Sequence, residues 1–117
     1  MNDLITTATS LTAAAKNVYD VASGMISSRK QNKLVTAAQV HRLENAIRQA
    51  LEADRMAAIH ALSNSERNYL IDSFNQIKDY ANTPMGIMLL ETVRDEARYM
   101  RGYIDDYDRL TKAGGYR

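Results

Sequence analysis

The sequence predicts an all-α fold, an antiparallel helical bundle of about four helices, on three observations. Apolar residues near both ends of the chain recur at alternating steps of four and three, which places them on one stripe of a helix that faces a partner helix. The chain has 1 proline and 5 glycines, which disfavours a β-rich fold with many turns. It has 0 cysteines, so a disulfide framework, thiol catalysis and zinc–thiolate sites are excluded.

The first helix should begin at Asn2 or Asp3, because either side chain can accept hydrogen bonds from the free backbone N–H groups of the first turn. Gly24 and the serines around it predict that the helix ends there, before a polar run over 29–33. Alanine alternates with larger residues along its heptad-like seam, which lets a neighbouring helix approach closely. The seam consists of Leu4, Ala8, Leu11, Ala15, Val18, Ala22 and Met25.

The second helix is expected to run from Thr36, or slightly earlier, to about Leu62. Asp54 falls on its apolar face. This position is consistent with a bend, with a frayed seam or with two shorter helices, and the sequence does not decide between them. The apolar face consists of Val40, Leu43, Ile47, Leu51, Ala58 and Leu62.

The third helix has the strongest local signal in the chain. Ser63 followed three residues later by Glu66 predicts a capping box, in which each side chain accepts a hydrogen bond from the other residue's backbone N–H. The helix should end near Asn82. Its apolar face consists of Leu70, Phe74, Ile77 and Ala81.

The fourth helix should begin with Thr83 as N-cap and Pro84 at the first helical position, where a missing N–H costs nothing. It is expected to extend to about Lys112. We therefore expect one helical-bundle domain over residues 1–112 and a flexible C-terminal tail over residues 113–117, with short loops that favour antiparallel neighbours. The heptad-like seam of this helix consists of Leu90, Val93, Ala97, Met100, Ile104 and Tyr107.

Charge and hydropathy limit which partners and which cellular compartment the sequence is compatible with. The formal net charge of +1 gives no bulk electrostatic case for nucleic acid or for an anionic membrane. No stretch approaches the roughly 18–20 continuous apolar residues of a membrane span. Asp3 stands where a signal peptide carries positive charge. We expect a soluble cytoplasmic protein with no membrane partner and no targeting segment.

No constellation of residues predicts a catalytic, metal or phosphate site, so we expect a protein that is not an enzyme and has no cofactor. Di-iron bundles use Glu-x-x-His pairs, and the sequence contains none. Arg55 and His60, with four residues between them, are similar to the core of the motif of HEPN ribonucleases. This resemblance covers the two residues alone. It implies an arginine that stabilises the scissile phosphate and a histidine that acts as acid or base.

The fourth helix carries the residues that we expect to contact a partner protein. The segment from Met85 to Leu90 is apolar all round, so either several helices enclose it or part of it docks on another chain. Further along, a small residue lies between two tyrosines one turn apart, an arrangement that permits close approach of a partner. The predicted contact residues are Met85, Met88, Tyr99, Gly102, Tyr103 and Asp106.

A basic segment supplies the alternative site. Over residues 27–48 the chain has a local excess of positive charge, and such a patch can contact the phosphate backbone of a nucleic acid. A basic loop that keeps the bundle soluble is the competing interpretation. The residues concerned are Arg29, Lys30, Lys33, Arg42 and Arg48.

Taken together, the sequence favours a non-enzymatic protein–protein interaction module: an adaptor, a regulator or an inhibitor that occludes a partner's surface. The partner is another protein or a second copy of the chain, because narrow seams can be completed within one chain or by two-fold pairing. A nucleic-acid-binding protein and a HEPN-like ribonuclease are the second and third hypotheses.

Overall fold

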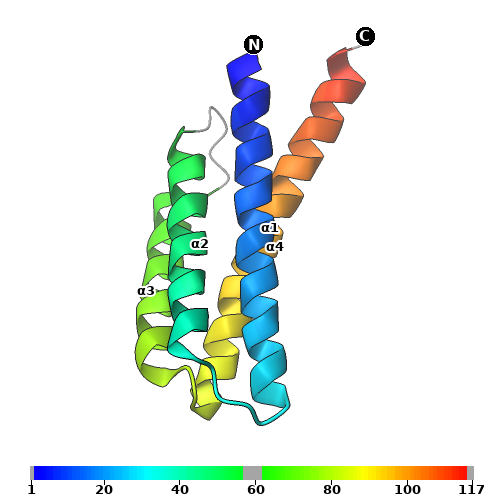
Figure 1. Cartoon of the computed structure of the whole chain (residues 1–117). Coiled ribbons are helices and arrows are strands. Elements are labelled where there is room, and N and C mark those ends of the chain that lie inside the picture. The colour runs from blue at the N-terminus through cyan, green and yellow to red at the C-terminus, as the bar shows by residue number, and fades with distance from the viewer. Residues whose placement is uncertain (1, 57–61, 116–117) are drawn as a thin grey trace.

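The computed structural model describes residues 2–56 and 62–115, and it describes side chains for residues 11–56 and 62–100. These residues form four α-helices and no strand. The helices are α1 (Asn2–Lys30), α2 (Ala37–Met56), α3 (Asn64–Tyr80) and α4 (Pro84–Gly115). They pack side by side and run alternately up and down (Figure 1). The predicted all-α bundle is confirmed.

The first and last helices form the centre of the bundle. α1 packs against both α4 and α2, α3 packs against α4, and the contact between α2 and α3 is slight. The molecule is elongated, 53 × 23 × 22 Å. α1 and α4 have 29 and 32 residues, against 20 and 17 in α2 and α3. They project beyond the other two at the end that holds both termini (Figure 1). We call this the open end, and the end that carries loop 31–36 and turn 81–83 the closed end.

Both predicted seams lie in the core over the residues whose side chains are described. Every described seam residue of α1 and α4 is at most 2% exposed. The remaining seam positions, Leu4, Ala8, Ile104 and Tyr107, lie outside the described side chains. The buried seam residues are Leu11, Ala15, Val18, Ala22, Met25, Leu90, Val93, Ala97 and Met100.

The predicted end of the first helix, at Gly24 and the serines up to Ser28, is too early, because α1 continues to Lys30. Met25 and Ile26 are buried, so the continued helix adds two apolar side chains to the core, and this outweighs the cost of about 1 kcal/mol for a helical glycine. The helix is terminated by Asn32, which lies two residues after its last residue and has a left-handed φ of 59°. Lys33 N donates to Ser28 O at 2.8 Å in the same turn, which completes a Schellman motif.

α2 begins one residue after Thr36, and a second capping box fixes its start. The hydroxyl of Thr36 accepts from Gln39 N at 3.1 Å, and the amide oxygen of Gln39 accepts from Thr36 N at 2.9 Å. The helix passes through Asp54 without interruption and is described to Met56. The segment 57–61, over which it was expected to continue to about Leu62, lies outside the described residues. Leu62 is buried but lies in a bend before the third helix.

The predicted capping box of the third helix is confirmed. Ser63 Oγ accepts from Glu66 N at 3.1 Å, and Glu66 Oε1 accepts from Ser63 N at 2.9 Å. α3 ends at Tyr80, two residues before the expected Asn82. The side chain of Asn82 instead bonds to the backbone of Val35, accepting from its N at 2.6 Å and donating to its O at 3.2 Å. Asn82 therefore joins the two connections of the closed end.

α4 begins at Pro84 as predicted, but the hydroxyl of Thr83 donates to Tyr80 O at 2.8 Å rather than accepting from the new helix. Gly86 lies against the end of α3: a Cβ placed there would be 2.4 Å from Ala81 O and 2.5 Å from Tyr80 O. α4 extends to Gly115, so the expected end at Lys112, with a tail from residue 113, is three residues too early. Ala113 is a strong helix former, and glycine is tolerated at a helix end.

Candidate protein-binding surfaces

The outer face of α4 exposes large apolar side chains. Met88 is 69% exposed, and Met85 and Tyr99 are each 49% exposed. Their spacing places them on one side of the helix, opposite the side that carries Leu90 and Val93 into the core. We define the α4 outer face as Met85, Met88 and Tyr99. The sequence predicted that the segment from Met85 was either enclosed or available for docking, and these two methionines are not enclosed.

Neighbouring helices flank this face on each side without covering it. On one flank, the guanidinium of Arg98 lies 5.6 Å from the ring centroid of Tyr19 on α1. On the other flank, Glu96 lies close enough to Glu66 on α3 for the two carboxylates to repel. α4 is thus fixed by α1 and α3, and its outer face is presented on a rigid element.

Three further predicted contact residues continue the same helix. Gly102, Tyr103 and Asp106 lie within α4, whose backbone is helical through all three positions. Gly102 lies three residues after Tyr99 and Tyr103 lies four after it, so helical periodicity assigns them to the same side. Their side chains lie outside the described residues.

Glu96 is a titratable group beside this face. Its Oε2 is buried and accepts no hydrogen bond from the described residues. Partial burial, and then repulsion from Glu66 and Asp95, raises the pKa of the Glu96 carboxyl above its ordinary value. A raised pKa in the folded state means that the ionised carboxylate destabilises the fold. This destabilisation sets in as the pH rises above the ordinary glutamate pKa and is complete above the raised pKa.

We therefore expect Glu96→Gln to stabilise the protein at pH 7 by about 0.5 kcal/mol, a small effect because solvent screens a partly exposed charge. The gain should be much smaller at pH 4, below the ordinary glutamate pKa of about 4.3, because the Glu96 carboxyl is then mostly protonated in both the folded and the unfolded chain. Urea denaturation at pH 7 and pH 4 measures it. Glu91→Gln removes the same charge from the same helix and is the control. A gain of equal size at both pH values would contradict the prediction.

The predicted basic site does not form one surface. Arg29 donates to the carbonyls of Lys33 and Asn82, both at 3.3 Å, so it supports the closed end. Arg48 pairs with Glu44 at 3.2 Å. Arg42 lies six residues from Arg48, on another side of α2, and lines a hollow between α1 and α2. Arg42 and Arg48 are exposed on α2, and Lys30 and Lys33 are exposed at the closed end.

Only Arg55 of the pair that is similar to the HEPN motif lies among the residues that the structure describes. Arg55 donates to both carboxylate oxygens of Glu52 at 2.7 Å on the surface of α2, and this contact raises the pKa of the Arg55 guanidinium. His60 lies outside the described residues. Across the described residues, no three His, Asp or Glu side chains are placed to hold one metal ion.

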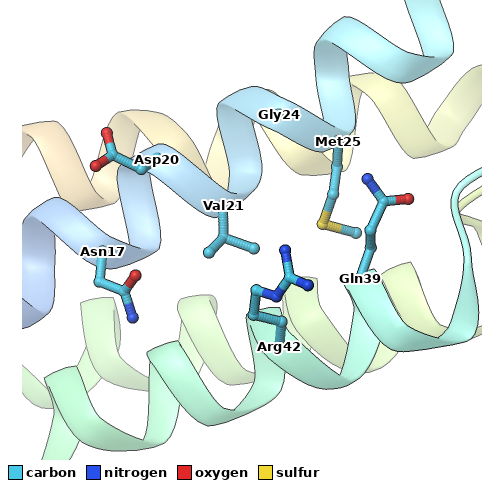
Figure 2. Close-up of a pocket in the computed structure, with 7 residues that line it drawn as sticks. All are labelled: Asn17, Asp20, Val21, Gly24, Met25, Gln39 and Arg42. Atoms are coloured by element: carbon cyan, nitrogen blue, oxygen red, sulfur yellow. The ribbon is translucent and has the colours of Figure 1, made fainter.

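A hollow of about 320 Å³ lies between α1 and α2 (Figure 2). Gly24 on its wall leaves it open, since a Cβ there would meet nothing within 4 Å. The guanidinium of Arg42 reaches from α2 toward Val21 and Met25 (Figure 2). A second hollow, of about 450 Å³, shares Asn17 with the first and continues toward Ala53. Both are open and carry mixed polar and apolar walls, and no described cluster of reactive groups lines them.

The ion pair between α2 and α3 is not predicted by the sequence. Asp54 is 0% exposed, and its Oδ2 accepts from Arg67 Nη2 at 2.7 Å. The position of Asp54 on the apolar face of the second helix indicates that its carboxylate needs a partner. The sequence does not identify that partner, because Arg67 lies 13 residues away on another helix. Because α2 and α3 otherwise make little contact, this pair is a main connection between them.

Comparisons with family models, with curated proteins and with solved structures found no match. None of the helices, over the described residues, has the length and apolar character needed to cross a membrane. The function must therefore be argued from the surfaces described above.

Proposed function

We propose that this protein is a non-enzymatic protein–protein interaction module, and that the α4 outer face is its contact surface. One observation carries the proposal: Met88 is 69% exposed, with Met85 and Tyr99 each 49% exposed on the same side of a helix whose opposite side is buried. The competing basic set is divided between structural contacts and separate sides of the bundle, which favours the apolar face over a nucleic-acid site.

The physical basis is the cost of leaving these side chains in water. Covering a methionine or a comparable apolar side chain completely is worth about 1.5–3 kcal/mol, and Tyr is frequent among the residues that dominate interface energies. Methionine adapts to irregular partner surfaces. A face of this kind on a rigid helix suits an adaptor, a regulator or an inhibitor that covers a surface of its partner.

The double variant Met88→Ser/Tyr99→Ser tests the proposal. We expect it to lose a stoichiometric protein partner that the tagged wild-type protein retains when purified from its native cell, with and without nuclease. Met56→Ser/Tyr69→Ser is a matched control, because Met56 and Tyr69 are 68% and 52% exposed on other helices. Mass spectrometry and the ultraviolet absorbance ratio of the eluate identify what is bound.

Two results would contradict it. If both double variants retain the partner equally, the α4 outer face is not the contact surface. If nuclease removes the partners and nucleic acid accompanies the untreated protein, the basic alternative takes precedence. Sedimentation of the purified protein identifies the case in which the partner is a second copy: the wild type sediments as a dimer and Met88→Ser/Tyr99→Ser as a monomer.

A further inference from the structure

Loop 31–36 at the closed end is fixed in position along its whole length. The Schellman motif at Asn32 sets its beginning, and the capping box of Thr36 sets its end. Between them, Asn82 holds the backbone of Val35 with two hydrogen bonds, and Val35 itself is 6% exposed. Arg29 adds a bridge between the carbonyls of Lys33 and Asn82.

This fixed loop presents an apolar side chain to solvent. Leu34 is 69% exposed, as much as Met88, although its neighbour Val35 is buried. A mobile loop could turn a leucine toward the core, but the backbone on both sides of Leu34 is held. Its exposure is therefore imposed by the fold rather than by a lack of structure.

The same end of the bundle is positively charged. Residues 21–43 contain no Asp or Glu and four basic residues, so the net charge of +1 is unevenly distributed along the chain. Arg29 supports carbonyls of the closed end and Arg42 lies in the hollow between α1 and α2. Lys30, the last residue of α1, and Lys33, which directly precedes Leu34 in the loop, are both exposed. Lys78 and Asp79 at the end of α3 add one charge of each sign.

We propose that the closed end binds an acidic segment of a partner protein, in which an apolar side chain covers Leu34 and flanking carboxylates pair with Lys30 and Lys33. An exposed leucine beside exposed lysines favours an acidic protein segment over other ligands. An exposed leucine adds nothing to the binding of a phosphate backbone, and two exposed lysines would neutralise few phosphates. Carboxylates spaced around an apolar residue match both features. This inference rests on the proposed function, because the ligand is again a protein. The surface is a different one, the closed end and not the α4 outer face.

The probe is a synthetic peptide in which glutamates surround two leucines, titrated into ¹⁵N-labelled protein and followed by NMR and fluorescence anisotropy. We expect shifts at the amides of residues 30–35, and binding that weakens as salt rises. Lys30→Glu/Lys33→Glu and Leu34→Ser should each weaken binding about tenfold, through lost charge pairing and lost apolar burial respectively. All three side chains are exposed, so these variants should fold.

Matched variants serve as controls. Met56→Ser changes a side chain of equal exposure, and Lys16→Glu/Arg48→Glu changes the same charge elsewhere. Both should bind the peptide with the affinity of the wild type. Met88→Ser/Tyr99→Ser should do so too, because it changes only the α4 outer face, and its loss of a partner would test the proposed function alone.

Three outcomes would overturn the inference: unchanged affinity in Lys30→Glu/Lys33→Glu, unchanged affinity in Leu34→Ser, or equal binding of a peptide with lysines in place of the glutamates. Phosphatidylserine vesicles and a DNA duplex are titrated in parallel. Tighter binding of either one through Lys30 and Lys33 would assign the closed end to that ligand and would also overturn the inference.

Discussion

Replacing Arg67 with methionine should lower the free energy of unfolding by about 3 kcal/mol, the largest effect that we expect from one substitution at the helix surfaces. Asp54 is completely buried, and the substitution removes the guanidinium that faces its carboxylate at 2.7 Å. Arg67 is 23% exposed, so its own desolvation is incomplete and the loss falls chiefly on Asp54. Urea denaturation of the wild type and the variant measures the difference.

The double variant Asp54→Asn/Arg67→Met separates this mechanism from a loss of packing. Asparagine has the shape of aspartate and carries no charge, so the double variant should recover about 2 kcal/mol of the loss. Arg55→Met, in which an exposed ion pair with Glu52 is removed, is the control and should change stability by less than about 1 kcal/mol. If the effects of the two substitutions simply add, the buried charge is not the cause.

Alanine at the two glycines with described surroundings should have opposite effects on stability. Gly86→Ala should destabilise the protein by about 2 kcal/mol, because its Cβ would overlap the carbonyl oxygens that end α3, and backbone cannot move aside cheaply. Gly24→Ala should stabilise it by about 0.5–1 kcal/mol, because the site is helical and a Cβ there meets nothing within 4 Å.

Thermal unfolding followed by circular dichroism checks this pair, and each variant controls for the other, since both substitutions raise helix propensity equally. Equal shifts in Tm would show that local propensity decides both positions and that the close approach of Gly86 to α3 is not significant. Gly24→Ala also adds a methyl group to the wall of the hollow between α1 and α2. If this variant binds the partner as well as the wild type does, the hollow is not the contact site.

Local interactions were the part of the fold that the sequence could predict. The capping box of Ser63 and Glu66 needs only residues three apart, and it occurs where the spacing predicted it. The two seams were identified by periodicity, because a residue every three or four positions must face the same neighbour. The end of α1 was misplaced because a glycine was given more weight than the two apolar residues after it, whose burial depends on other helices.

The features of the fold that the sequence does not predict depend on interactions between residues that are distant in the sequence. The charge of Asp54 on an apolar helix face is explained by Arg67, which lies on another helix. The place of Asn82 is explained by its hydrogen bonds to Val35, which is distant in the sequence. Neither partner can be selected from the sequence, because many basic residues and many backbone groups were available. Met85 and Met88, which the sequence predicts as contact residues, are exposed. Which of the apolar residues from Met85 to Leu90 face outward depends on the positions of α1 and α3.

The position of α1 at the centre of the bundle has a consequence for synthesis of the chain. Of the four helices α1 is synthesised before the others, yet its main neighbour is α4, which is synthesised after the other three. Contacts between distant segments form only after the whole intervening chain is available. Each newly made molecule therefore passes through an interval in which the apolar stripe of α1 has only α2 to cover it. Chaperone binding and aggregation should be concentrated in that interval.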